Sequence, residues 1–584
     1  MKLWRIFSLA SIAMAILVTV IVLSFFWKVR SISGVVRTNT GQRVSGALVR
    51  VKTKAISTET DINGHFVLTG LDPVSRMHLT SWKDGYYVAG VEVWPWDSRV
   101  EFKLEPYAVP DNHEYSWMPP AVELRSVSTE WLTKTGLNLA AGLSFQRLFL
   151  PLAEHLTLGC QDCHDQTIND QWSGSAHALG ANNLRFLTMY NGTDVNGNRS
   201  PSTQRGYSRD YGVFPLRPNP NQPYYGPGYK LDFPRTAGNC AACHQPSAAI
   251  EKPYGVDPNQ VAGVDARGSH CDFCHKIADV KIDPATGHPF ENMPGILSIE
   301  LMRPSPDQQL FFGPYDDVDV GPDTFLPLMK QSEICAPCHN ATFWGVPIYQ
   351  SFAEWRASPY PDEGKVCQSC HMKPDGVTTN FAPGRGGLER EPQSIPTHFF
   401  PGAADETLLQ NAVTMNTSTK RQDGQVNVKV TITNDKTGHH VPTDSPLRQM
   451  ILLVEARNAQ GQALTLIEGP TVPDWGGVGD PDEGCYAGLP GKGFAKILQE
   501  LWTEVAPTGA YWNPTRILSD NRITAFAADT SSYSFAASDE GYLTVDVKLL
   551  FRRAFIKLMD QKRWDVPDIM MARQTVIVDE NKDE

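Results

Sequence analysis

Hydrophobic and polar residues follow a different pattern in each part of the chain, beginning with a long apolar run. From Ile6 to Trp27 the sequence has 22 residues without a charge. As a helix this run would measure roughly 33 Å, enough to cross the hydrocarbon core of a bilayer. A cleaved signal peptide usually has an apolar region of only about 7 to 15 residues. We therefore predict a retained signal anchor over residues 1–30, a transmembrane helix, with a cleaved signal peptide as the alternative.

The next pattern is a series of short β-prone stretches between residues 31 and 106. Turn sequences such as Asn63-Gly64 separate them, and these residues favour tight reversals of the backbone. This spacing predicts a small β-sandwich.

Strand and helix patterns both occur in the last part of the chain, residues 405–584. Val426, Val428 and Val430 alternate with polar residues, as in a strand with one buried face. Residues 493–505 instead carry apolar side chains at helical spacing, which predicts a helix there. We expect a β-rich domain that contains this helix.

Length and charge narrow the classes of protein to consider. At about 150 residues per domain, 584 residues leave room for three or four domains. The 52 basic and 64 acidic residues give a formal charge of −12, and no long basic run is available to neutralise phosphates. We therefore expect no nucleic-acid partner.

The cysteines carry the strongest chemical signal. Ten of the 11 form five C-x-x-C pairs, each followed directly by histidine, and only Cys485 stands alone. With 15 histidines in 584 residues, five such coincidences have a chance probability on the order of 10⁻⁸. A zinc ribbon, a disulfide framework and a thioredoxin-like pair are the alternatives, but none of them requires a histidine after every pair. The five motifs are Cys160-Cys163-His164, Cys240-Cys243-His244, Cys271-Cys274-His275, Cys335-Cys338-His339 and Cys367-Cys370-His371.

C-x-x-C-H is the attachment signature of c-type haem. On one helical turn the two thiols share a face, so they can bond to the two vinyl groups of one porphyrin while the histidine ligates its iron. The sequence therefore predicts five covalently bound haem c groups, with the ten cysteines as attachment sites and the five histidines as iron ligands. Because c-type haem is attached outside the cytoplasm, we expect a single-pass protein of the cytoplasmic membrane, with its bulk in the periplasm or on the extracellular side.

These patterns predict a multidomain fold class. The predicted regions are a signal anchor at 1–30, a small β-sandwich at 31–106, a haem-packed, mainly helical or irregular pentahaem cytochrome c domain at 107–404, and a C-terminal β-rich domain at 405–584.

The supply of other histidines bears on the sixth position of each iron. Outside the five motifs and the first β region, eight histidines remain for five irons. That is enough for every haem to have two histidine ligands, which would leave no open position for a substrate.

Two resemblances add to this interpretation. The string from Ser33 to Leu71, with Gly46-Ala47 and Thr60-Asp61, resembles the carboxypeptidase regulatory-like domain, which implies a β-sandwich without catalytic residues. The string CQDCHDQTINDQWSGSAHALG resembles the superfamily of tetrahaem cytochromes c, pentahaem nitrite reductases and octahaem hydroxylamine oxidoreductases.

The second resemblance implies distal ligands. Matching the W-x-x-S-x-H pattern makes His177 a ligand of another haem, and THFFPGA does the same for His398. TGHHVPTDSPLR resembles the G-H-x-x-P-T segment that opens the C-terminal domain of these proteins, which favours His439 over its neighbour His440. This segment departs from the family pattern at Asp444, where glycine is commoner. His270 and His288 lie in no such motif, and for them iron ligand and surface histidine stay open.

We therefore predict a membrane-anchored, extracytoplasmic pentahaem cytochrome that relays electrons between a membrane redox enzyme and soluble carriers. The alternative is a multihaem oxidoreductase that acts on a small inorganic nitrogen or sulfur compound at one five-coordinate haem. The C-x-x-C-K motif typical of the nitrite reductases does not occur in this sequence.

Overall fold

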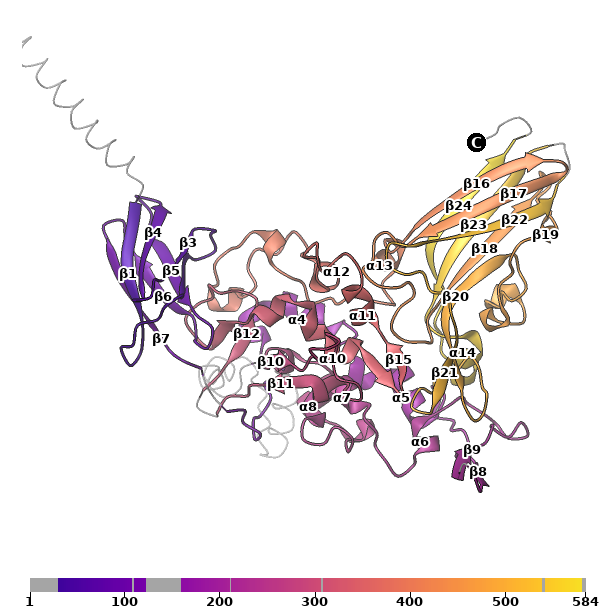
Figure 1. Cartoon of the computed structure of the whole chain (residues 1–584), viewed down its shortest axis with the longest axis horizontal. Helices are drawn as coiled ribbons and strands as arrows, with labels where there is room; N and C mark the ends of the chain where they lie inside the picture. Colours follow the sequence, from indigo (N-terminus) through magenta and orange to yellow (C-terminus); the bar gives the residue numbers. More distant parts are fainter. Residues whose placement is uncertain are drawn as a thin grey trace, which may run out of the picture.

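The computed structural model describes residues 30–107, 110–121, 159–210, 212–305, 308–537 and 541–579. Figure 1 shows a β-sheet unit at each end of the molecule, with short helices between them. Strands account for 31% and helices for 19% of the described residues.

The N-terminal unit is a two-layer β-sandwich. One sheet has the strand order β4-β1-β7 and the other β3-β2-β5-β6. Ile32, Leu79 and Phe102 from the two sheets are almost completely buried in one shared core. The strands are β1 (Arg30–Thr38), β2 (Leu48–Val51), β3 (Ser57–Glu59), β4 (His65–Leu71), β5 (Met77–Trp82), β6 (Ala89–Val93) and β7 (Arg99–Leu104).

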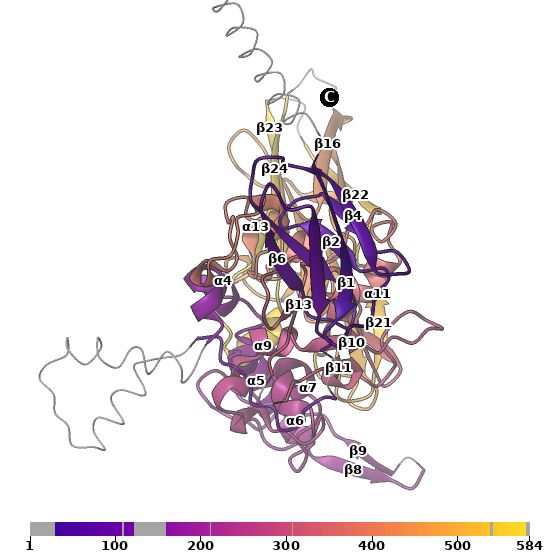
Figure 2. The ribbon, with the colours of Figure 1, turned by 90° about the vertical axis from the view of Figure 1, so that its left-hand side faces the viewer.

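The central part consists of short helices and two-stranded sheets joined by long connections. Its longest described helix, α4, has 13 residues. The helices are α4 (Gln161–Ser173), α5 (Leu184–Asn191), α6 (Tyr229–Asp232), α7 (Ala241–His244), α8 (Pro246–Ala249), α9 (Cys271–Cys274), α10 (Ala336–His339), α11 (Ser351–Arg356), α12 (Gln368–His371) and α13 (Glu406–Gln410). The strands are β8 (Arg205–Ser208), β9 (Gly212–Pro215), β10 (Ile277–Val280), β11 (Ile299–Leu301), β12 (Phe311–Gly313), β13 (Asp323–Phe325), β14 (Ala341–Phe343) and β15 (Val346–Tyr349). The β8–β9 hairpin projects away from the rest of the molecule (Figure 2).

The C-terminal unit contains the longest strands. A four-stranded sheet has the order β16-β17-β22-β19, and a five-stranded sheet has the order β21-β20-β18-β23-β24. Their inward-facing residues, including Val428, Leu452 and Val547, form the largest apolar core of the molecule. The elements are β16 (Thr414–Gln422), β17 (Gln425–Thr433), β18 (Gln449–Arg457), β19 (Leu466–Glu468), β20 (Gly491–Glu500), β21 (Thr515–Asp520), β22 (Ala528–Ala536), β23 (Leu543–Arg552), α14 (Ile556–Lys562) and β24 (Ile569–Val578).

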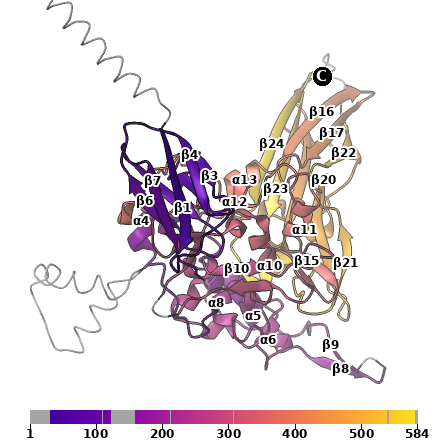
Figure 3. The same ribbon diagram turned by 60° about the vertical axis from the view of Figure 1, so that its left-hand side comes forward.

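Both β units contact the central part, and Figure 3 shows them rising from opposite sides of it. From the sandwich, Arg50 pairs with Asp316 at 3.1 Å. From the C-terminal unit, the buried Lys562 Nζ donates hydrogen bonds to three carbonyl oxygens of the central part, those of Thr188, Thr193 and Pro227. These contacts attach the sandwich and the C-terminal unit to the central part.

The predicted fold class was wrong. The described chain is β-rich, and the described residues between 107 and 404 do not form a helical domain packed around haem. The physical reason is the length of the helices, because each of α7, α9, α10 and α12 covers only four residues. A single turn can present a motif, but it has too little surface to build a helical core.

The predicted single-pass membrane localisation is also not supported. Among the described residues, no helix is long and apolar enough to cross a bilayer. The anchor expected at residues 1–30 falls almost entirely on residues 1–29, which lie outside the described part of the chain.

The helix predicted for residues 493–505 was wrong as well. This segment forms most of β20, which pairs with β18 and β21. Six consecutive residues of β20, Gly493 to Leu498, are buried, so both faces of the strand lie in the interior. From the sequence alone, a continuous apolar run of this kind fits both a helix and a strand that is buried on both faces. Only the strands packed beside it decide between the two.

Phe494 tests the position of β20 in the core. This side chain is fully buried in the largest core, so Phe494→Ala should lower the free energy of unfolding by about 3–5 kcal/mol. Ile517→Ala on the adjacent β21 is the control, since Ile517 is 40% exposed and should change stability by only about 0.5 kcal/mol or less. Denaturant unfolding measures both, and equal effects would contradict the strand arrangement.

Candidate haem-binding site

Each C-x-x-C-H motif lies on a single helical turn. In four motifs the histidine N–H donates to the carbonyl of the first cysteine, at 3.0–3.1 Å; these histidines are His164, His244, His275 and His371. This bond closes one turn, which places both thiols and the imidazole on neighbouring faces. The geometry matches what thioether attachment of one porphyrin requires.

All five motifs face one continuous cavity of about 2040 Å³. All ten motif cysteines and all five motif histidines line it, and all 11 cysteines of the chain are free thiols. The volume exceeds the roughly 300–1,000 Å³ of an ordinary small-molecule pocket. The cavity therefore has the lining and the size expected for several large cofactors. The described residues contain no group of three or more His, Cys, Asp or Glu side chains placed to hold a bare metal ion.

The motif histidines are oriented through Nδ1. His164 Nδ1 lies 2.9 Å from the Phe381 carbonyl oxygen, and His371 Nδ1 lies 2.7 Å from that of Pro401. His275 is held by the Phe312 carbonyl at 2.6 Å. A ligating histidine usually donates its second ring N–H in this way, which leaves Nε2 free for a metal. Burial also lowers the pKa of His275 to about 4, so its ring is in the neutral form that binds metals.

Two further histidines face motif histidines across the cavity. The ring centres of His177 and His339 are 6.3 Å apart, and those of His371 and His439 are 6.4 Å apart. With metal–nitrogen bonds of roughly 2 Å, two imidazoles on opposite sides of one metal ion have ring centres about 6 Å apart. Each of these two pairs could therefore hold one haem iron between its rings, at the fourth motif (His339 with His177) and at the fifth (His371 with His439).

The other predicted distal ligands have different surroundings. His398 is half-buried in the cavity wall close to His164 and His275, and its buried Nδ1 has no hydrogen-bond partner among the described residues. His270 Nδ1 accepts a hydrogen bond from the Phe273 N–H at 3.2 Å. That bond places the ring proton on Nε2, whereas iron ligation through Nε2 needs it on Nδ1. His288 is not among the residues that line the cavity.

The thiols connect the motifs to one another. Cys160 and Cys271 lie within hydrogen-bonding reach, as do Cys243 and Cys338. Cys335 and Cys367 make a third such contact, and Cys274 lies close enough to Cys338 to interact electrostatically. These contacts link the first motif to the third, the third to the fourth, and the fourth to both the second and the fifth. No motif is isolated from the other four.

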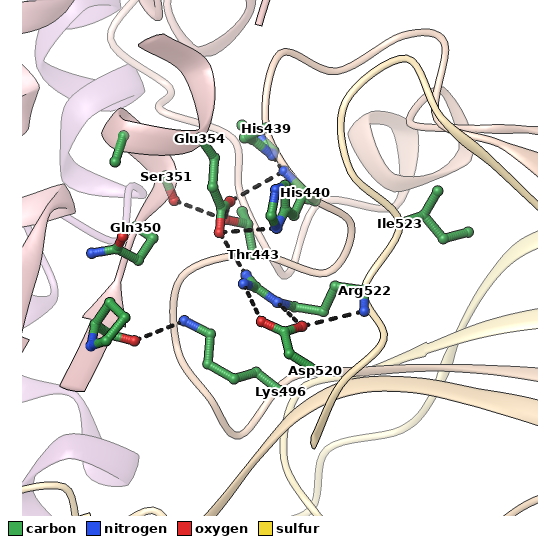
Figure 4. A network of polar contacts seen from close by, with 12 residues as sticks. Gln350, Ser351, Glu354, His439, His440, Thr443, Lys496, Asp520, Arg522 and Ile523 are labelled. Atoms are coloured by element: carbon green, nitrogen blue, oxygen red, sulfur yellow. Dashed lines mark hydrogen bonds and ion pairs between the residues drawn. The ribbon is translucent and has the colours of Figure 1, made fainter. Parts of the chain in front are cut away.

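A buried polar network holds the loop that carries His439. Figure 4 shows Arg522 between Asp520 and Glu354, with Glu354 facing His440 and Thr443. Arg522 donates to Glu354 at 2.7 Å, and the His440 N–H donates to the same carboxylate at 3.1 Å. The nearby Lys496 Nζ donates to the Pro347 carbonyl at 2.9 Å. The network therefore joins α11 to the loop before β18 that carries His439, and the His439 ring itself has its Nδ1 at 3.0 Å from the His440 carbonyl oxygen.

Asp444 is the site residue whose role the sequence did not reveal. Its carboxylate lies 3.2 Å from His339 Nδ1. The Nδ1 atoms of His164, His275 and His371 face backbone carbonyls instead. Burial lowers the pKa of His339, but the Asp444 carboxylate, together with Cys338 and Cys367, outweighs burial and raises it to about 9, so iron binding at Nε2 would have to release a proton from this ring. The departure from glycine at this position was visible in the sequence. Its φ of +66° lies in the left-handed region, which aspartate tolerates better than most residues.

Comparisons with known proteins give only distant likenesses. No family model matches the sequence, and no curated protein matches it. A penta-haem cytochrome c552 from Thermochromatium tepidum is similar in structure, with a TM-score of 0.48 and 18% identity over 72% of this chain and 97% of that chain. A PapD-like domain of human CEP192 has a TM-score of 0.13 and 6% identity over 30% of this chain and 89% of its own. Likenesses this distant do not establish the family of this chain.

The facing pair His371–His439 gives a testable prediction for the loaded protein. In His439→Ala, one iron should lose its second ligand and show a new high-spin signal by EPR. His440→Ala is the matched control, because His440 Nδ1 faces Glu354 at 3.4 Å, and it should leave the spin states unchanged. The reverse outcome would show that the ligand is His440.

Asp444 should tune the haem at the fourth motif. A carboxylate hydrogen-bonded to a ligating histidine increases the basicity of the ring and favours the oxidised iron. Asp444→Asn should therefore raise the reduction potential of one haem by tens of millivolts, where about 59 mV corresponds to a tenfold change in equilibrium. Spectropotentiometric titration measures the shift, and the exposed Asp435→Asn in the same loop serves as the control. Unchanged potentials in Asp444→Asn would refute the assignment.

Proposed function

We propose that this protein is a pentahaem c-type cytochrome that relays electrons between a redox enzyme and a soluble electron carrier. The observation that supports the proposal is the single cavity lined by all five C-x-x-C-H motifs. Haem iron bound there would supply one-electron redox chemistry. Cysteines of different motifs lie close to one another, so the five attachment sites would place their groups near one another.

The protein's own residues would hold and insulate these groups. Backbone carbonyls and Asp444 orient the motif histidines, while His177 and His439 stand opposite two of them. Two imidazoles on one iron leave no position for a substrate, which favours a carrier over a catalyst. Apolar walls keep water away from the cofactor and so influence its potential.

His244 supports a second candidate, an oxidoreductase with one open iron. Burial lowers the pKa of its ring to about 4, so it can ligate as a neutral imidazole. Its ring stacks on Phe186 at 3.8 Å. Within the described part of the chain, no ring contact pairs His244 with a second histidine; His164 and His275 also lack such a contact, but His398 lies near both of them. The substrate would be a small inorganic nitrogen or sulfur compound.

Covalent haem content is the first test. Cys271→Ser should lower the number of haems per chain, measured by pyridine haemochrome and intact mass, because each porphyrin needs its thiol pair. Cys485→Ser, outside the motifs, is the control and should retain five. A protein that carries no covalent haem, or a Cys271→Ser variant that keeps all five, would refute the proposal.

EPR of the same oxidised protein separates the two candidates. Five low-spin haems that do not respond to nitrite or cyanide are expected for the electron carrier. A high-spin signal from about one haem in five that shifts on addition of cyanide would favour the oxidoreductase and identify an open iron.

A further inference from the structure

Three arginines come together in the cavity wall from segments that are distant in the sequence. Arg185 lies on α5, Arg448 precedes β18, and Arg553 follows β23. All three line the cavity and are partly buried. The cluster is absent from the sequence patterns because its members are more than 100 residues apart in the chain.

No carboxylate is hydrogen-bonded to these arginines within the part of the chain that the structure describes. Arg448 donates a side-chain hydrogen bond to the Thr443 carbonyl at 3.1 Å, and Arg553 Nε is buried without a hydrogen bond. Burial lowers the pKa of Arg185, and the charges of Arg553 and Arg448 lower it further. Asp444 is close enough to interact with Arg448 electrostatically, but its carboxylate is hydrogen-bonded to His339. One carboxylate shared in this way cannot neutralise three guanidinium groups that repel one another.

Two other arginines with little exposed side-chain surface are each paired with a carboxylate. Arg552, next to Arg553, pairs with Asp568 at 2.7 Å, and Arg522 pairs with Glu354 at the same distance. Leaving partly buried cations without an anion is costly, so a cluster of this kind in a cavity wall suits an anionic ligand. The planar guanidinium group suits groups with two or more anionic oxygens, which it can bind through two parallel N–H donors.

The cluster lies beside the second motif. Arg185 directly precedes Phe186, whose ring is stacked on His244. Met189, also on α5, packs in one apolar cluster with Leu447, the residue before Arg448. An anion held by the arginines would therefore lie in the region of the cavity near His244, for which the described residues show no facing histidine.

We propose that Arg185, Arg448 and Arg553 form a binding site for an anionic oxygen group in the cavity near His244. Two sources share this chemistry: a free oxyanion such as sulfate, and the propionate carboxylates of a haem attached at Cys240 and Cys243. The propionate source rests on the proposed function, because it requires a haem at the second motif; the free oxyanion does not.

Sulfate is the first probe, because it tests the arginines without being a strong iron ligand. Isothermal titration of the haem-loaded protein in a sulfate-free buffer should give saturable binding, at least about tenfold weaker in Arg448→Gln and Arg553→Gln, since both remove a charge-assisted donor. Arg553→Lys should recover part of the affinity. Arg573→Gln is the control, because Arg573 pairs with Asp546 on the C-terminal sheet and does not line the cavity.

Redox titration of the same samples identifies the propionate source. If the arginines neutralise propionates, wild type binds no sulfate, and the glutamine variants lower the potential of one haem, because unpaired carboxylates favour the oxidised iron. Variants that match wild type in both sulfate binding and every potential would overturn the proposal.

A haemochrome count on each sample keeps the two proposals apart. A full count with no effect in either assay rejects the arginine site alone. A chain without covalent haem rejects the proposed function, while sulfate binding still reports on the arginines.

Discussion

The direction of four of the five motif histidines depends on an acceptor that the motif itself does not contain. His164, His275 and His371 use backbone carbonyls of distant segments, and His339 uses Asp444. A one-turn helix fixes where a ring is attached but leaves it free to rotate about its side-chain torsions. The long connections of the central part therefore position these rings, because they bring an acceptor to Nδ1 and leave Nε2 free for a metal.

The described central part has a smaller apolar core than either β unit. The C-terminal sheets and the sandwich each enclose a large cluster of buried aliphatic side chains, whereas the central part divides its buried residues between one cluster around Phe273 and Ile299 and small clusters around Phe352 and Leu310. Beside these clusters lies the large cavity. Protein interiors are close-packed, with few voids larger than a water molecule, so a cavity of this size suits large apolar ligands such as haem. The sandwich and the C-terminal β unit contact the central part from opposite sides.

The partly or fully buried arginines differ in whether a carboxylate is hydrogen-bonded to them. The Glu354–Arg522 pair carries additional hydrogen bonds from His440 and Thr443, and so the network can be buried without an orphaned charge. Its position couples the β-sheet unit to the loop with His439. Among the described residues, no carboxylate is hydrogen-bonded to the three arginines near His244, and this contrast with the Glu354–Arg522 pair is the basis of the proposed anion site.

Local sequence determined the features that depend on residues close together in the chain. The spacing of each C-x-x-C-H motif fixed which thiols and imidazole share a turn, and alternation located strands such as β17 (Gln425–Thr433). Tertiary structure decided what depends on distant partners. Residues 493–500 became a strand because β18 and β21 lie on either side of them, and the short helices of the central part did not assemble into a helical domain. The facing histidines, the carboxylate of Asp444 and the arginine cluster all join segments far apart in sequence, and no local pattern encodes such a pairing because local periodicity reports burial and not the identity of the neighbour.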